Sequence, residues 1–125
     1  MIGYITLGTN DLPRAVAYYD ELMKLLGAGR FLEDESFVAW SQSAESPGFS
    51  VTKPFDGKKA TVGNGVMIAL NVENKEQVHA LYNKAIELGG TDEGKPGLRS
   101  DDGFYCGYFR DLDGNKLNVF CMAGK

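Results

Sequence analysis

Residues 2–9 alternate between apolar and polar positions, as a half-buried strand does, with Ile5 and Leu7 on one face. Beyond them the apolar residues recur every three or four positions, which is the period of an amphipathic helix. Asp11 is of a type favoured at helix N-caps, and Gly27 is of a type that ends helices. The pattern therefore predicts a strand and then a helix between these two residues.

The same pattern returns 63 positions later. The segment from Tyr4, YITLGTNDLPRAVAYYDELMKLLG, lies over the segment from Met67, MIALNVENKEQVHALYNKAIELGG. Asn74 takes the place of Asp11, and Gln77 three residues on forms a capping-box arrangement with it. Because strand, cap, helix and stop recur in the same order, we predict a duplicated unit.

Three short strand-like runs follow each predicted helix. They cover about 29–33, 37–42 and 48–53 in the first half, and about 90–93, 104–110 and 116–122 in the second. The chain thus reads as an α+β protein of two βαβββ repeats, which form curved mixed sheets around a cavity with the helices outside. We expect one domain, with repeats at about 1–55 and 66–125 and a connector at about 56–65.

The last two strands are joined by the Asp-Gly pair at 113–114, a strong hairpin signal. A symmetric turn at this pair would place Cys106 opposite Cys121, and Phe109 opposite Asn118. No Cys-x-x-Cys spacing is present. We therefore interpret the two cysteines as buried reduced thiols, with a disulfide as the alternative.

The segment DEGKPGLRSDDG, residues 92–103, is predicted to be a loop because it is rich in glycine and charge. One interpretation is a lid that carries Lys95 and Arg99 toward an anionic group of a ligand. The other is an ordinary surface loop.

Composition and charge exclude several classes of protein. With 43% apolar residues, the 125-residue chain can bury a core, which argues against disorder. A net charge of −4 argues against nucleic acid or an anionic membrane as a partner. The sequence shows no apolar run of the roughly 18 residues that a membrane span needs, and no secretory signal. We therefore expect a cytoplasmic protein.

Two segments carry a resemblance to a known family. YITLGTNDLPRAVAYYDELM at the start and YFRDLDGNKLNVF at the end are similar to the opening and closing motifs of the vicinal oxygen chelate superfamily. That superfamily includes glyoxalase I, bleomycin-resistance proteins and extradiol dioxygenases. The resemblance covers essentially the whole chain. It implies two sheets that curl around a ligand cavity, and a homodimer.

The resemblance also implies where a metal would bind. The four ligand positions of the metalloenzymes map onto Tyr4, Met67, Asn118 and Ser50, or Thr52 if the alignment shifts. Zinc, nickel, iron and manganese prefer imidazole, thiolate or carboxylate donors, and none of these positions supplies one. The single histidine, His79, belongs to the second predicted helix, on the wrong side of its sheet. We therefore expect no metal and no other cofactor.

Alternation along the strands predicts which side chains face the cavity. These are Tyr4, Thr6, Ala39, Ser50, Thr52, Met67, Ala69, Asn71, Tyr105, Phe109, Asn118 and Phe120. Such an apolar and aromatic set with a few neutral polar groups is typical of small-molecule pockets. We hypothesise a metal-free member of the superfamily that binds a small molecule.

Two alternatives stay open. One is a glyoxalase-type lyase, or another enzyme of the superfamily, with an unusual metal or none. The other is a dimeric interaction domain whose cavity is filled by its own side chains. The sequence singles out no catalytic residue.

Overall fold

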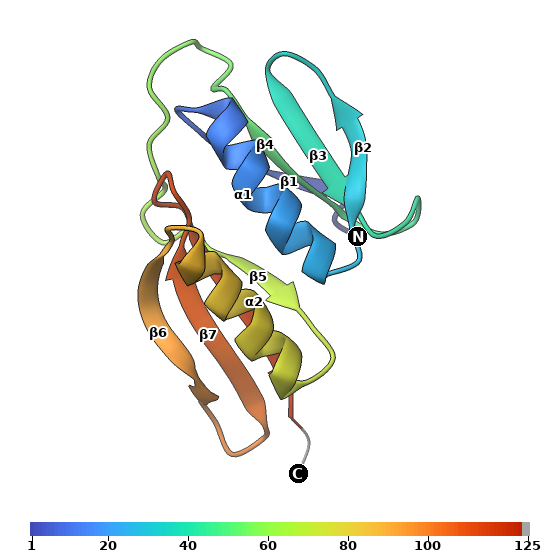
Figure 1. Cartoon of the computed structure of the whole chain (residues 1–125), viewed down its shortest axis with the longest axis vertical. Helices are drawn as coiled ribbons and strands as arrows, with labels where there is room; N and C mark the ends of the chain where they lie inside the picture. Colours follow the sequence, from blue (N-terminus) through green and yellow to red (C-terminus); the bar gives the residue numbers. More distant parts are fainter. Residues whose placement is uncertain (124–125) are drawn as a thin grey trace. The chain divides into compact units, whose positions relative to one another are not determined.

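The structure, a computed structural model, describes residues 1–123. The chain divides between Val62 and Gly63 into two compact units, called unit 1 and unit 2 here, and each has the βαβββ order (Figure 1). Unit 1 contains β1 (Tyr4–Gly8), α1 (Leu12–Leu25), β2 (Gly29–Glu33), β3 (Phe37–Ser41) and β4 (Gly48–Thr52). Unit 2 contains β5 (Ile68–Asn71), α2 (Lys75–Glu87), β6 (Thr91–Leu98), β7 (Phe104–Arg110) and β8 (Lys116–Met122).

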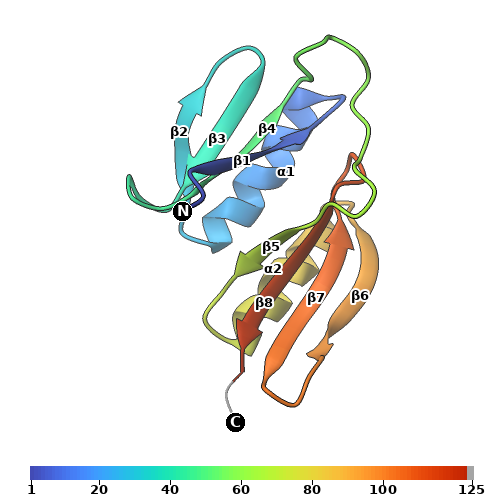
Figure 2. The same ribbon diagram turned by 180° about the vertical axis from the view of Figure 1, so that it is seen from behind.

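The predicted repeat of two four-stranded mixed sheets is confirmed. The strand orders are β1-β4-β3-β2 and β5-β8-β7-β6, so equivalent strands take equivalent places. The first strand of each unit runs parallel to the last, and the other pairs are antiparallel. Within each unit the helix covers one face of the sheet, and Figure 2 shows the other face, which carries no helix. We call this second face the open face.

Both helices begin at the predicted caps. The Asp11 carboxylate accepts a hydrogen bond of 3.1 Å from the backbone N–H of Arg14, and the Asn74 side chain accepts one of 2.9 Å from that of Gln77. The Gln77 side chain in turn accepts from the backbone N–H of Glu73 at 2.6 Å. These bonds satisfy N–H groups that have no partner inside a helix. Neither helix is long and apolar enough to cross a membrane among the residues that the structure describes.

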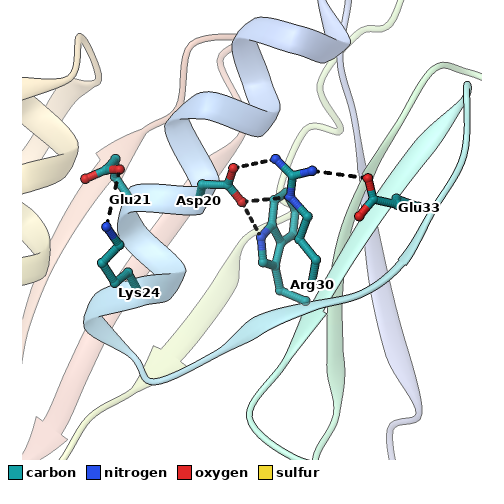
Figure 3. A network of polar contacts seen from close by, with 6 residues as sticks. Asp20, Glu21, Lys24, Arg30 and Glu33 are labelled. Carbon is teal, nitrogen blue, oxygen red and sulfur yellow. Dashed lines mark hydrogen bonds and ion pairs between the residues drawn. The ribbon is translucent and has the colours of Figure 1, made fainter.

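A polar cluster ties α1 to the sheet of unit 1. The indole N–H of Trp40, which is 1% exposed, donates a hydrogen bond of 2.9 Å to Asp20 on α1. Arg30 on β2 donates two more to the same carboxylate, at 3.1 and 2.6 Å, and also pairs with Glu33 at 3.2 Å (Figure 3). The Arg30 hydrogen bonds, aided by Trp40, hold the pKa of Asp20 below its usual range. A buried indole N–H is thus satisfied without a water molecule.

Strand β6 is longer than predicted, and the loop predicted over residues 92–103 is wrong for residues 92–98. The strand continues to Leu98, and its pairing with β7 shifts register on both sides of Gly94. Such irregularities let a glycine-rich segment stay hydrogen-bonded while it bends, so its composition alone suggested a loop. Lys95 therefore lies within a strand, and only the residues after Leu98 form the connection to β7.

The register predicted for the last hairpin is wrong by one residue. The loop has three residues between Asp111 and Asn115, and the Asp111 carboxylate accepts from the backbone N–H groups of Asp113 and Asn115 at 2.9 Å each. Gly114 has φ +90°, the left-handed conformation that such a loop requires at its last position. A shift of one residue changes every cross-strand pair. Two side chains that were predicted to lie opposite each other on one face then lie on different faces.

The register shift separates the two cysteines. Cys106 pairs with Phe120, and Cys121 pairs with Tyr105, so the thiols lie on opposite faces of the sheet. Both are free and buried. Their side chains point apart, which is a geometry that a disulfide cannot span without movement of the backbone.

Candidate functional site

The open face of unit 1 contains a cavity of about 300 Å³. All four strands of the sheet contribute to it. Its lining residues are Tyr4, Thr6, Phe31, Leu32, Phe37, Ala39, Ser50 and Thr52. We call this cavity the unit 1 pocket.

A bulge in β2 builds the aromatic wall of this pocket. Arg30 pairs with Trp40 and points to the α1 face, whereas Leu32 pairs with Ala39, which lines the pocket. The extra residue between them, Phe31, also reaches the pocket, so two successive side chains of β2 line the same cavity. A regular strand would have sent one of them to the helix side.

Gly48 provides the space that the aromatic wall occupies. A Cβ atom at this position would lie 3.1 Å from the Tyr4 Cβ and 3.2 Å from the Phe31 Cζ. Both distances are shorter than ordinary van der Waals contact between carbon atoms. The glycine at the start of β4 therefore lets these two side chains approach each other.

The polar side of the pocket is a pair of hydrogen-bonded hydroxyl groups. The Ser50 hydroxyl lies 2.8 Å from the Ile5 carbonyl oxygen, to which it donates, and 2.9 Å from the Thr6 hydroxyl. Because a hydroxyl has one hydrogen, Thr6 must be the donor in the second bond. Both hydrogens are thus used within the protein, and only oxygen lone pairs are left for a ligand.

The hydrogen of the Thr52 hydroxyl is also used within the protein. This hydroxyl lies 2.9 Å from the Lys53 carbonyl oxygen and 3.2 Å from that of Ser36, and it can donate its single hydrogen only to such an acceptor. The hydroxyl groups of Thr6, Ser50 and Thr52 therefore offer hydrogen-bond acceptors and no free donor, and the Tyr4 phenol is the fourth hydroxyl group of the lining.

In unit 1 the five residues predicted to face a cavity all line this pocket; they are Tyr4, Thr6, Ala39, Ser50 and Thr52. Their role in ligand binding stays a prediction. The predicted set lacked Phe31, Leu32 and Phe37, three large apolar side chains that also line the pocket. The available signal was the cluster of three large apolar residues in two short adjacent strands, but alternation alone could not show a bulge.

In unit 2 the predicted residues divide between the two faces of the sheet. Asn118 and Phe120 share the open face with Asn71, which pairs with Phe120 in β5. Met67 precedes β5 and is 39% exposed.

Tyr105 and Phe109 were placed on the wrong face, because the hairpin register is shifted. The Tyr105 hydroxyl lies 2.6 Å from the His79 Nε2 on α2. Phe109 pairs with Leu117, and Phe109 and Leu117 are both fully buried. Their strand neighbour Gly107 confirms the direction, since a Cβ there would lie 3.2 Å from the Tyr82 ring of α2. The odd-numbered positions of β7, to which Tyr105 and Phe109 belong, therefore face the helix.

Asn118 is the most unusual residue of the open face of unit 2. It is 1% exposed, and neither its side-chain nitrogen nor its side-chain oxygen makes a hydrogen bond of normal geometry among residues 1–123, although the amide interacts with the Tyr108 phenol. Tyr108 lies directly across from it in β7. A hydrogen-bonding interaction with Cys106 and then burial raise the pKa of the Tyr108 phenol, while a hydrogen-bonding interaction with the Asn118 side chain lowers it. Buried amides are normally paired, so this one needs an explanation.

The residues at the four ligand positions of the superfamily do not fit a metal ion. They supply a phenol, a thioether, a hydroxyl and an amide, from Tyr4, Met67, Ser50 and Asn118. The described part of the chain holds no group of three histidine, cysteine, aspartate or glutamate side chains arranged to bind one. These neutral donors do not offset the cost of dehydrating a divalent cation.

Comparison with known proteins agrees with this architecture. The model of the Glyoxalase/Bleomycin resistance protein/Dioxygenase superfamily matches residues 1–119. A glyoxalase/bleomycin resistance protein from Albidiferax ferrireducens is 34% identical, with a TM-score of 0.88 and coverage of 97% of this chain and 98% of that one. A hypothetical protein from S. aureus, SA1046, is 26% identical, with a TM-score of 0.69 and coverage of 97% and 96%.

A lactoylglutathione lyase from Agrobacterium tumefaciens shares the fold, with 20% identity, a TM-score of 0.69 and coverage of 97% of this chain and 92% of that one. No curated protein matches the sequence. The match of the superfamily model over nearly the whole chain, together with the repeated βαβββ units, shows the family. The chain therefore belongs to the glyoxalase/bleomycin resistance protein/dioxygenase superfamily.

Proposed function

We propose that the protein binds, without a metal, a small aromatic molecule that carries an N–H or O–H group, and that the unit 1 pocket is the site. The observation that carries this proposal is the direction of the hydrogen bonds at Thr6, Ser50 and Thr52, whose hydrogens are all used within the protein. A ligand gains a hydrogen bond from these three hydroxyl groups only by donating one. Binding without reaction is also what the resemblance to bleomycin-resistance proteins implies.

The size and the surface of the pocket support an aromatic ligand. Its volume of about 300 Å³ lies at the lower end of small-molecule pockets, which span roughly 300–1,000 Å³. Tyr4, Phe31 and Phe37 can pack edge or face against a ring, and such contacts add about 0.5–1.5 kcal/mol each beyond area burial. Ring and donor together describe a compact heteroaromatic or phenolic compound.

Indole and benzofuran form a matched pair of probes. The two have nearly the same shape, but indole has an N–H donor where benzofuran has an ether oxygen. We expect indole to bind more tightly, roughly three- to tenfold, because a neutral hydrogen bond contributes about 0.5–1.5 kcal/mol. Chemical shifts of unit 1 amide groups during titration would measure both affinities. Equal affinities, or tighter binding of benzofuran, would refute the donor requirement.

Three variants test the site. Phe31→Ala removes one wall and should weaken indole binding by roughly tenfold, whereas Phe55→Ala, a fully exposed phenylalanine outside the pocket, should leave it unchanged. Thr6→Val keeps the shape but removes an acceptor, so it should reduce the preference for indole over benzofuran.

Other outcomes would favour the alternative functions. Turnover of a hemithioacetal that a chelator abolishes would replace this proposal with a metal-dependent lyase. If neither probe perturbs unit 1, the interaction domain with a filled cavity becomes the better interpretation.

A further inference from the structure

A second cavity of unit 1 lies at the carboxyl ends of β1 and β4. These two strands run parallel, so the residues that follow them, Thr9 and Lys53, leave the sheet at the same end. The cavity has a volume of about 290 Å³ and shares no lining residue with the unit 1 pocket. Its lining residues are Thr9, Asn10, Leu12, Lys53, Pro54, Gly57, Lys58 and Lys59. We call this cavity the lysine pocket.

Hydrogen bonds hold the two walls of the lysine pocket together. One wall is the turn between β1 and α1, and the other is the connector after β4, which lies beside that turn in Figure 1. The Asn10 side chain donates to the Ala60 carbonyl oxygen at 3.1 Å and accepts from the Ala60 N–H at 2.7 Å. A Cβ atom on Gly8 would lie 3.2 Å from the Ala60 Cβ, so this glycine lets the connector pack closely against β1. The cavity is therefore fixed by bonds within the protein.

A tight turn shapes the connector wall. The Gly57 N–H donates a hydrogen bond of 3.1 Å to the Pro54 carbonyl oxygen. Gly57 has φ +74°, a left-handed conformation that glycine adopts at little steric cost. The turn returns the chain to the cavity, so that three lysines line it, which are Lys53, Lys58 and Lys59.

The three lysines of the pocket have no acidic partner. No carboxylate lies within 4.0 Å of their ammonium groups among residues 1–123, although the chain has a net charge of −4. The acidic residues next to the lining residues in the sequence have other partners. Asp11 caps α1 and pairs with Arg14 at 3.9 Å, and the Asp56 carboxylate accepts from the backbone N–H of Lys58 at 2.9 Å. Positive charge is therefore concentrated at this cavity.

We infer that the lysine pocket binds the phosphate group of a small, soluble phosphate monoester. Three ammonium groups around one cavity suit such an anion, which carries a charge of about −1.5 to −2 at neutral pH and has three strong acceptor oxygens. Lysine binds phosphate as a point charge on a flexible stem, so each of these exposed side chains can approach a different oxygen. None of the lining residues is an arginine, whose planar fork would match a carboxylate.

The apolar part of the lining leaves room for the organic group of the ester. Leu12 and Pro54 belong to opposite walls of the cavity. They offer apolar contact to a short carbon chain, while the phosphate stays with the lysines. This inference is independent of the aromatic ligand proposed for the unit 1 pocket, because the two cavities share no lining residue.

Glycerol 3-phosphate is the probe, with glycerol and glycerate as controls at equal ionic strength. Glycerol lacks the charge, and glycerate carries a carboxylate of a single charge instead of the phosphate. In a titration followed by nuclear magnetic resonance, the probe should shift the backbone amide signals of residues 9–12 and 53–60 in a saturable way. It should bind roughly tenfold more tightly than glycerate. If none of these signals moves at concentrations on the order of 10 mM, or if glycerate binds equally well, the inference fails.

Charge variants distinguish a site from general attraction. Lys53→Gln, Lys58→Gln and Lys59→Gln should each weaken binding of the probe by roughly three- to tenfold, because each loses a charge-assisted hydrogen bond. Lys75→Gln is the matched control, since it removes an equal charge from an exposed lysine at the start of α2. It should leave the affinity unchanged. Equal loss in all four variants would mean nonspecific charge attraction and would overturn the site.

Asn10→Ala tests whether the cavity itself is needed, without a change in charge. The substitution removes both hydrogen bonds to Ala60 and releases the connector from the turn. Affinity for glycerol 3-phosphate should fall by roughly threefold or more, because the lysines must then be ordered at the moment of binding. Native fluorescence of Trp40, the single tryptophan, would show that unit 1 stays folded. Unchanged affinity in such a protein would mean that phosphate contacts exposed lysines without the cavity, which would overturn the inference.

Vesicles distinguish a soluble phosphate monoester from a lipid headgroup of the same chemistry. Phe55 is fully exposed next to Pro54 of the pocket, and an exposed aromatic ring among lysines is also found in segments that contact anionic membranes. In sedimentation with phosphatidylcholine vesicles that contain phosphatidate, the protein should stay in solution. Lysine-dependent binding to these vesicles, without any response to glycerol 3-phosphate, would overturn the assignment of a soluble ligand.

Discussion

Replacing Asn118 with leucine is expected to stabilise the protein. The side chain is 1% exposed and neither of its polar atoms makes a hydrogen bond of normal geometry, so the substitution removes a cost of about 1–3 kcal/mol. Leucine has a similar size, and burial of its apolar surface contributes about 1.5–3 kcal/mol. Imperfect packing of the leucine side chain reduces this gain in stability by about 1–3 kcal/mol. We expect the free energy of unfolding to rise by about 1–2 kcal/mol.

Urea unfolding followed by far-ultraviolet circular dichroism measures this change, because both units contain helix and sheet. Trp40 is the single tryptophan and lies in unit 1, so its fluorescence reports on that unit separately. Asn115→Leu is the control. Its buried amide nitrogen donates to the Asp111 carboxylate at 3.1 Å, so the same substitution there should lower stability by at least about 1 kcal/mol.

A clear result would refute this reasoning. If Asn118→Leu lowers the unfolding midpoint as much as Asn115→Leu does, at an unchanged dependence on urea, then the Asn118 amide is satisfied in the folded protein.

Four further predictions concern thiols, ionisation and assembly. Thiol titration of denatured protein should find two free thiols, because Cys106 and Cys121 lie on opposite faces of the sheet. If no free thiol is found, the two cysteines form a disulfide and their assignment to opposite faces is wrong. Burial, and then Asp92, raise the pKa of Tyr82 to about 12, so its contribution to stability is complete below the unfolded pKa of 10.0 and is lost as the pH rises through 12. Tyr82→Phe should remove this alkaline dependence in pH-dependent urea unfolding. The pKa of Asp20 is lowered in the folded protein, so the contribution of this carboxylate to stability is present above its unfolded pKa of 3.8 and is lost as the pH falls below that value. In urea unfolding at different pH values, Asp20→Asn should reduce the loss of stability at acid pH. An unchanged loss would contradict the role of the polar cluster in Figure 3. The homodimer implied by the family resemblance predicts twice the chain mass of 13.6 kDa in light scattering, and a mass of one chain would contradict it.

Local features of the chain were predictable because they depend on neighbouring residues. The caps at Asp11 and Asn74 form inside one helical turn, and the alternation of β1 places Ile5 and Leu7 on the helix side wherever the strand pairs. The duplication follows from comparing the chain with itself. These signals were enough for the fold class and for the bounds of most strands.

The composition of the candidate sites depended on long-range hydrogen bonding. A two-residue hairpin at positions 113–114 is reasonable in isolation, but the Asp111 carboxylate stabilises a three-residue loop and shifts the register by one. That shift moved Tyr105 and Phe109 to the helix side and set Tyr108 across from Asn118. Strand faces have a period of two, so a single-residue slip reverses every assignment beyond it.

The sequence by itself determined the repeat, the helix limits and the absence of ionic metal ligands at the four mapped positions. Only the tertiary structure decided that a bulge in β2 brings Phe31 and Leu32 to one pocket, and that the Asn118 amide is buried without a hydrogen bond of normal geometry. The physical reason is the same in both cases. Strand register and side-chain burial are set by pairing between segments far apart in the chain, whereas helix caps and alternation are set within a few residues.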